Sequence, residues 1–156
     1  MENIKKYLKG LKINFKTYSH PAVYTCEEAE QHNKNIKGIH SKNLFIKDKK
    51  SKKFYLIILP ANKNLDMAEL GEILNDKIKF ANENDLREIL DLSAGSVSPF
   101  GLINDTENKV QIVIDKEVWN SDFVSFHPNI NTETLELTRE DFHKYIKSLK
   151  NILKII

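Results

Sequence analysis

The feature that most constrains the fold is an uninterrupted apolar run at residues 54–59. The run reads Phe-Tyr-Leu-Ile-Ile-Leu, so apolar and polar positions do not alternate along it. A strand with one side in water alternates apolar and polar side chains, whereas a strand covered on both faces does not. The run therefore predicts a central β-strand with other elements packed on both faces of its sheet.

Helical and strand patterns are interspersed along the rest of the chain. Apolar spacing and capping residues predict helices over residues 2–11, from residue 25 onward, and over 67–74, 85–92 and 139–149. Alternation predicts strands at residues 14–20, 42–48, 77–81, 110–114, 123–126 and 134–137. Because the order lacks a regular βαβ repeat and several turns are short, we expect an α+β fold. It would be one domain over residues 1–156, with a mixed, mostly antiparallel sheet flanked by helices.

Composition excludes several classes of protein. The net charge of +2 over 156 residues gives no global basic field, so any polyanion must be bound locally. Cys26 is the only cysteine, which rules out an internal disulfide. No apolar stretch reaches the length of a membrane span, and the first residues lack the apolar run of a signal peptide. We therefore expect a cytoplasmic protein with no membrane partner.

Two segments carry groups suited to a phosphorylated ligand with a reactive carbonyl. Lys42 stands at the entrance of a predicted strand, where its ammonium could fix one phosphate. Residues 95–101 read Gly-Ser-Val-Ser-Pro-Phe-Gly, and the backbone N–H groups of such a loop can bind a carbonyl or an anion. We expect Lys42 and the amides near Gly95 to line one cleft, without a carboxylate pair or nucleophile.

These two segments occur with three others in an order typical of one family. The five lie at residues 20–25, 42–50, 80–90, 95–102 and 126–132, and together they cover nearly the whole chain. On these motifs the chain resembles the YbaK/ProX family of freestanding aminoacyl-tRNA editing domains, relatives of the insertion domain of bacterial prolyl-tRNA synthetase. Within that family it is most similar to the branch that removes alanine from proline tRNA.

The resemblance implies a deacylase that hydrolyses the ester of mischarged tRNA(Pro), above all Ala-tRNA(Pro). Its partner would be the acceptor stem and CCA end of the tRNA, with prolyl-tRNA synthetase as a further candidate, and it would need no cofactor or metal. Such enzymes work by positioning the ester and a water, with backbone donors on the oxyanion and help from the ribose hydroxyl of the substrate.

The same resemblance implies roles for individual residues. Lys42 would contact phosphate, Asn43 would offer a donor and an acceptor to a ribose hydroxyl or water, and His127 would position substrate or water. The residues implied as catalytic are Lys42, Asn43, Gly95, Ser96 and His127. Those implied as substrate-binding are His20, Phe45, Val97, Ser98, Pro99, Phe100, Asn131 and Thr132.

Simpler interpretations of these residues remain open at this point. Lys42 could be a solvated lysine at a strand end, and Gly95 could end a helix. The lysine-rich turn at residues 47–53 could be a solvated hairpin tip or could touch the acceptor stem. A zinc site from His20, Cys26, His32 and His40 lacks a recognisable ligand spacing.

Two other functions are also open. One is deacylation of Cys-tRNA(Pro), as in the YbaK branch. The other belongs to a different class of protein, in which the domain binds a charged tRNA or an amino acid without turnover. It would then act as a regulator linked to proline metabolism.

Overall fold

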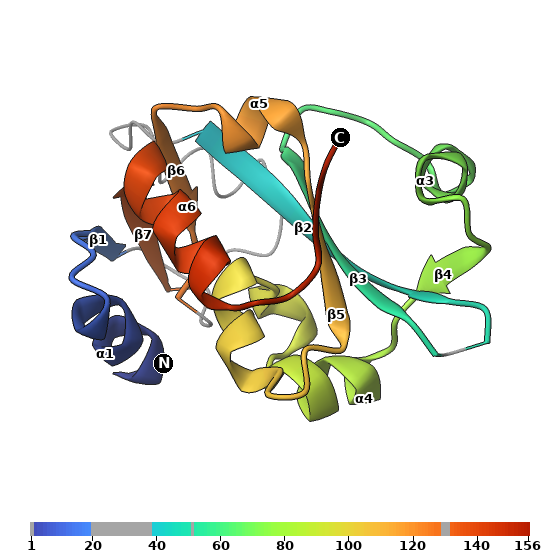
Figure 1. Ribbon diagram of the computed structural model, residues 1–156, viewed down its shortest axis with the longest axis horizontal. Coiled ribbons are helices and arrows are strands. Elements are labelled where there is room, and N and C mark those ends of the chain that lie inside the picture. Colours follow the sequence, from blue (N-terminus) through green and yellow to red (C-terminus); the bar gives the residue numbers. More distant parts are fainter. Residues whose placement is uncertain (1, 20–38, 51, 129–131) are drawn as a thin grey trace.

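An inner strand with two covered faces organises the sheet (Figure 1). In the computed structural model, which describes residues 2–19, 39–50, 52–128 and 132–156, this strand is β3 (Phe54–Pro60). Its neighbours are β2 (Ile39–Asp48), which is antiparallel, and β5 (Val110–Ile114), which is parallel. Leu56 faces the larger hydrophobic core and Ile57 the smaller one on the opposite face. The buried central strand predicted from the apolar run is confirmed.

The remaining strands extend the sheet on both sides. Its order is β1-β7-β6-β2-β3-β5-β8, with β4 paired to β2. The β1–β7, β6–β7, β2–β3 and β2–β4 pairs are antiparallel, whereas β2–β6, β3–β5 and β5–β8 are parallel. The expected mixed and mostly antiparallel sheet is therefore confirmed. The bounds are β1 (Lys16–Ser19), β4 (Ile78–Phe80), β6 (Phe123–Phe126), β7 (Glu133–Thr138) and β8 (Leu153–Ile155).

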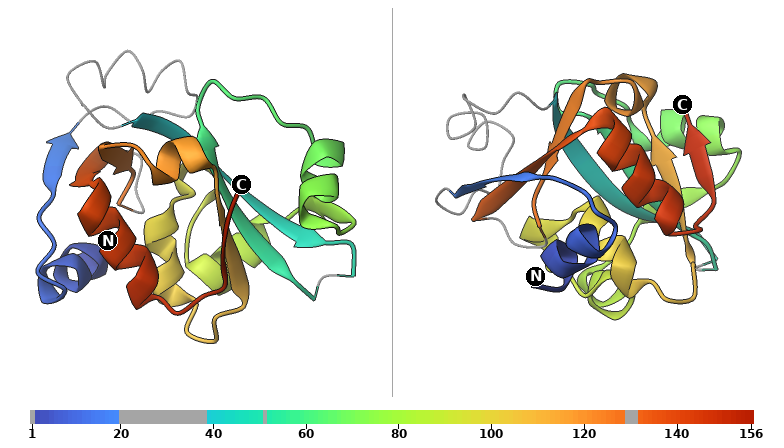
Figure 2. Two further views of the ribbon diagram at one scale, coloured as in Figure 1. Left: turned by 45° about the horizontal axis from the view of Figure 1, so that its top comes forward. Right: turned by 60° about the vertical axis from the view of Figure 1, so that its left-hand side comes forward.

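Helices cover both faces of the sheet (Figure 2). Side chains of α1 (Glu2–Gly10) and α6 (Arg139–Ser148) belong to the larger core, whereas Leu70 of α3 (Met67–Leu74) lies in the smaller one. Short helical segments complete the chain: α4 (Glu83–Asp85), η1 (Leu86–Leu90), η2 (Ala94–Ser96), η3 (Pro99–Asn104) and α5 (Lys116–Trp119). Among the described residues, no helix has the length and apolar character needed to cross a membrane.

The outer edge of β2 is shared by two different strands. β6 pairs with its first residues, Ile39 and His40, and β4 pairs with its last, residues 46–48. Between these pairings, no strand in the described part of the chain bonds to the outer edge of residues 41–44. The Phe45 carbonyl oxygen already accepts from the Ala81 amide, just after β4, at 3.0 Å. The sheet therefore splits along the middle of β2, in the segment that the sequence marks as functional.

Several boundaries differ from those expected. β2 begins three residues earlier than predicted, because its start pairs with the distant strand β6. The predicted helix at 85–92 begins after Asn82, whose side chain forms a reciprocal capping box with Asp85, and it ends at Asp91 in a left-handed conformation. The sequence pattern missed α5 and β8, which are too short to show a period. The helix expected from residue 25 lies outside the described residues.

A close approach at Gly101 gives a direct test of this packing. A Cβ at Gly101 would lie 2.6 Å from Leu92 Cδ1 and 3.2 Å from the Leu90 carbonyl oxygen. Gly101→Ala should therefore lower the free energy of unfolding by about 1–3 kcal/mol in chemical denaturation, the usual cost of overpacking. Gly10→Ala is the control, because nothing lies within 4 Å of a Cβ there. Equal stability of the two variants would contradict the close packing of η3 against residues 90–92.

Candidate functional site

A hydrogen bond joins the two segments that the sequence singled out. Asn43 Nδ2 on β2 donates to the Val97 carbonyl oxygen at 3.2 Å, across 54 residues of chain. Val97 directly follows η2, so the bond fixes the loop at residues 95–98 against the open part of β2. The fold thus brings together the segment around Asn43 and the glycine-bracketed loop.

Two further hydrogen bonds hold the same loop from other elements. Ser98 Oγ donates to the His127 carbonyl oxygen at 2.5 Å, just after β6, and accepts a bond from the Phe100 amide. The Tyr145 hydroxyl on α6 donates to the Pro99 carbonyl oxygen at 2.7 Å. Burial raises the pKa of Tyr145 well above its ordinary value, so the hydroxyl stays a donor at any working pH. The loop is therefore held by β2, by the end of β6 and by α6.

The loop offers backbone donors that this network does not use. The Ser96 amide bonds to the Ser93 carbonyl at 3.0 Å. The amides of Gly95 and Ser98 form no hydrogen bond with any residue that the structure describes. Gly95 does not need its special backbone freedom, because no described glycine has a positive φ. The two amides are the donors left for a carbonyl or an oxyanion.

Two buried acceptors lie on the same face of β2 as the loop. Asn43 Oδ1 and Ser41 Oγ are shielded from solvent and have no hydrogen-bond partner among the residues that the structure describes. Residues two apart on a strand project to the same face, and Asn43 Nδ2 shows that this face meets the loop. A buried polar atom without a partner is costly, which makes these two oxygens candidate contacts for a ligand donor.

His127 lies at the end of β6, beside the loop. Its Nδ1 is 3.0 Å from the Glu133 carbonyl oxygen, which can only accept. The neutral ring therefore carries its proton on Nδ1, and Nε2 is the acceptor nitrogen. Thr132 is exposed in the turn before β7, whereas Asn131 lies outside the described residues, as does His20.

Lys42 lies on the other face of β2. It pairs with Leu59 of the smaller core, whereas Asn43 pairs with Ile58 of the larger one. Adjacent residues of a strand project to opposite faces, so Lys42 and the loop do not line the same side of β2. This differs from our expectation of one cleft lined by both. Within the described part of the chain, Lys42 forms no ion pair.

Three of the residues implied as substrate-binding have side chains in the core. Phe45 is 5% exposed and its ring stacks on Phe54 with centroids 5.7 Å apart. Phe100 is fully buried and its ring packs edge-on against Phe126 and Tyr145. Pro99 is buried as well. These side chains pack in the interior beneath β2 and the loop, so they support the backbone of the site and are not exposed at its surface.

Sequence reasoning missed two participants. Tyr145 has the spacing of an ordinary core residue on α6, and nothing in the pattern marks its hydroxyl as a loop contact. Ser41 precedes Lys42, and the only signal in the sequence was its position two residues before Asn43, which places both side chains on one face of a strand. The zinc alternative is not tested, because three of its four side chains (His20, Cys26 and His32) lie outside the described residues.

The bond from Tyr145 to the loop can be tested by removing one oxygen. Tyr145→Phe keeps the ring but leaves the Pro99 carbonyl without its donor, so the free energy of unfolding should fall by about 1–3 kcal/mol in urea denaturation. Tyr18→Phe on β1 is the matched control, because Tyr18 has no side-chain hydrogen bond with any described residue. A Tyr145→Phe protein as stable as this control would show that the bond does not hold the loop.

Comparison with known proteins identifies the family of the chain. Residues 20–145 match the family model of the aminoacyl-tRNA editing domain. The prolyl-tRNA editing protein ProX of Acetoanaerobium sticklandii is 37% identical over 150 residues, covering 96% of this chain and 92% of that protein. The prolyl-tRNA synthetase associated domain-containing protein 1 of Mus musculus is 33% identical over 150 residues, covering 93% and 88%.

The fold is also that of a solved structure described as a candidate trans-editing enzyme for prolyl-tRNA synthetase. The two superpose with a TM-score of 0.75 at 16% identity, over 99% of this chain and 93% of the other. From the family match, the relatives and the fold, the chain belongs to the aminoacyl-tRNA editing domain family.

Proposed function

We propose that the protein is a trans-editing hydrolase that removes alanine from mischarged tRNA(Pro). Family membership supports an editing reaction, and the names of the ProX relative and of the structural neighbour point to proline tRNA. The observation that carries the proposal is the bond from Asn43 to Val97. It joins the loop, whose Gly95 and Ser98 amides have no described partner, to the face of β2 whose Ser41 Oγ and Asn43 Oδ1 have none among the described residues either.

These groups suit the hydrolysis of an activated ester. Water attacks the ester carbonyl carbon, and the amides of Gly95 and Ser98 donate to the oxygen as it becomes negative. The bond between the carbonyl carbon and the ribose oxygen then breaks, and that oxygen takes up the proton that the attacking water has lost, so it leaves as a hydroxyl. Because the loop is held before substrate arrives, its donors need little reorganisation.

The acceptors complement these donors. Ser41 Oγ and Asn43 Oδ1 accept from donor groups of the aminoacylated adenosine, such as its ammonium or its free ribose hydroxyl, or from the attacking water. His127, with its proton held on Nδ1 by the Glu133 carbonyl, positions water or a hydroxyl through Nε2. No residue has to act as a nucleophile in this scheme.

Lys42 serves the same substrate from the other face of β2. The outer edge of residues 41–44 has no described strand partner, so an RNA terminus that crosses this edge can contact both faces. The ester then lies with Asn43 and the loop, while a phosphate of the terminus meets Lys42. An ammonium with no ion pair among the described residues suits that phosphate contact.

The proposal predicts that Asn43 is essential as a donor. In a deacylation assay with Ala-tRNA(Pro), Asn43→Ala should lower kcat by about 100-fold, the cost of disturbing a pre-organised donor set. Asn43→Asp keeps both size and acceptor but cannot donate to the Val97 carbonyl, so it should fail similarly. The thermal unfolding of both variants checks that the fold is intact. A wild-type protein that leaves the ester as stable as buffer does would rule out the enzyme.

A panel of esters on one tRNA identifies the amino acid. Alanyl, cysteinyl and seryl esters of tRNA(Pro) should be compared at equal concentration, with alanine expected to be released fastest. Preferential release of cysteine would assign the protein to the other deacylase activity. Saturable binding of the charged tRNA without release of any amino acid would favour a regulator.

A further inference from the structure

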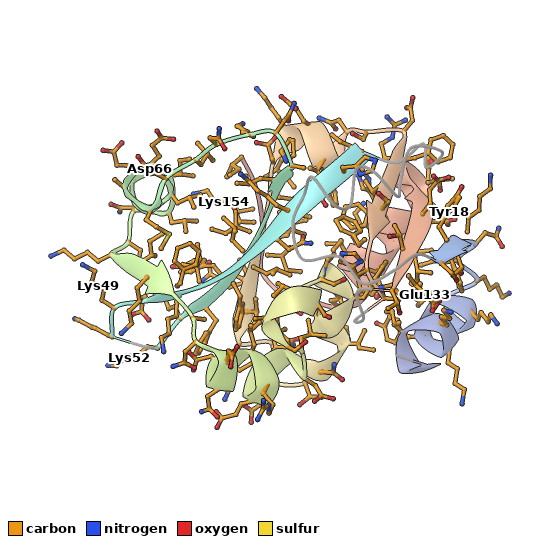
Figure 3. All side chains as sticks on the ribbon, turned by 180° about the vertical axis from the view of Figure 1, so that it is seen from behind. Tyr18, Lys49, Lys52, Asp66, Glu133 and Lys154 are labelled. Atoms are coloured by element: carbon orange, nitrogen blue, oxygen red, sulfur yellow. The ribbon has the colours of Figure 1, made fainter. Side chains whose placement is uncertain are left out.

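Exposed lysines gather at the end of the molecule formed by the β2–β3 hairpin and β4. Figure 3 shows Lys49 and Lys52 projecting outward there, far from Tyr18 and Glu133 at the opposite end. None of these lysines forms an ion pair with a residue that the structure describes. The five that we call the hairpin lysines are Lys49, Lys50, Lys52, Lys53 and Lys77. Lys79 is left out because it pairs with Lys47 and therefore projects to the face of β2 opposite Lys42.

Asp48 and Asp76, two acidic residues of this region, form no ion pair with the hairpin lysines that the structure describes. Asp48 accepts from the backbone amides of Lys52 and Lys53 at 2.7 and 2.8 Å, and these bonds lower its pKa. Asp76 accepts from the Tyr55 hydroxyl at 2.7 Å and from the Lys77 amide at 2.9 Å. Both carboxylates are therefore committed to neutral donors.

Lys47, by contrast, is already paired. Its Nζ lies 2.7 Å from Asp85 Oδ2, and both side chains are mostly buried. Lys47 therefore supports the fold and is not part of the exposed set. Lys47 thus has its charge paired within the protein, whereas the charges of the hairpin lysines are available to a binding partner.

An exposed aromatic ring lies beside these lysines. Phe80, the last residue of β4, is 59% exposed although most phenylalanines of a small domain are buried. It pairs with Ile46 of β2, and Ile46 lies on the same face of the strand as Lys42, four residues away. Phe80 therefore lies on the Lys42 face of β2, between Lys42 and the hairpin lysines.

We propose that Phe80 and the hairpin lysines form a docking surface for the end of the tRNA acceptor stem, with Lys42 at the end nearest the ester. From Lys42 to Lys49 the strand spans about 23 Å, enough for several phosphates of an RNA backbone. The lysines contact phosphates and the Phe80 ring stacks on an unpaired base, the two features of single-strand recognition. This inference rests on the proposed function, because it supplies the RNA contacts of the same site.

Exposed lysines alone do not identify an RNA-binding surface, so the test needs a control. Other exposed lysines of the same chain provide it. α1 and β1, at the opposite end of the molecule (Figure 1), carry the exposed lysines Lys6, Lys9 and Lys16. No exposed large hydrophobic residue lies on these two elements within the described residues. Removing three lysines at either end changes the net charge by the same amount. A difference in tRNA affinity between the two variants would therefore show that the location of the lysines matters.

The test is the binding of uncharged tRNA(Pro) over a series of salt concentrations. The triple variant Lys49→Ala, Lys52→Ala and Lys77→Ala should bind at least tenfold more weakly than wild type. The slope of log K against log salt should become less steep by about 2 to 3, near one for each lost phosphate contact. The control triple Lys6→Ala, Lys9→Ala and Lys16→Ala should keep the wild-type slope. An unchanged slope in the hairpin variant, or equal losses in both triples, would overturn the proposal.

Substitution of Phe80 tests the stacking contact separately. Phe80→Leu keeps an apolar side chain but removes the flat ring, and it should weaken binding about tenfold. Phe80→Tyr keeps the ring and should bind like wild type. Equal affinity of the two variants would rule out stacking. Because uncharged tRNA is the ligand, a protein that binds it through this surface but does not hydrolyse the ester would contradict only the proposed reaction.

Discussion

The alternation of side chains along β2 is the constraint on which the rest of the site depends. Odd-numbered residues, among them Ser41 and Asn43, face the loop and the larger core, and even-numbered ones, among them Lys42, face the smaller core. Because this period is fixed by strand geometry, neighbouring residues of one short motif must serve opposite faces. In our account the ester is held on one face and the RNA backbone on the other. In this proposal, one strand contributes residues both to the chemistry and to RNA binding.

The loop at residues 95–98 is held in place before any ligand binds. Asn43, Ser98 and Tyr145 connect residues 97–99 and 127 through three side-chain hydrogen bonds that originate on β2, in the loop itself and on α6. Each such bond contributes only about 1 kcal/mol to folding. Their larger consequence is geometric, since donors that are already oriented stabilise a developing charge without reorganisation. In the proposed mechanism, the domain therefore positions the ester with backbone groups and without a nucleophilic side chain.

A feature of the fold or the site could be predicted from the sequence when the residues that cause it are close together in the chain. The strand at residues 54–59 was predictable because its pattern is local, and the motifs near Lys42 and Gly95 carried the family. The split of the sheet at residues 41–44 was not predictable, because β6 and β4 reach β2 from distant parts of the chain. The contact from Tyr145 and the exposure of Phe80 likewise depend on tertiary packing, which no periodicity encodes. The opposite orientations of Lys42 and Asn43 could have been predicted, because adjacent residues of a strand project to opposite faces. The expectation of one cleft lined by Lys42 and the loop did not take this into account.

The most direct measurement is a crystal structure of the protein with a hydrolysis-resistant amide analogue of an alanylated CCA trinucleotide. Our account predicts that the carbonyl oxygen of the analogue accepts hydrogen bonds from the Gly95 and Ser98 amides, on the Asn43 face. A phosphate of the same molecule should contact Lys42 on the opposite face, with the RNA crossing the outer edge of β2 between residues 41 and 44. A carbonyl far from the loop, or a trinucleotide confined to one face of β2, would contradict the account.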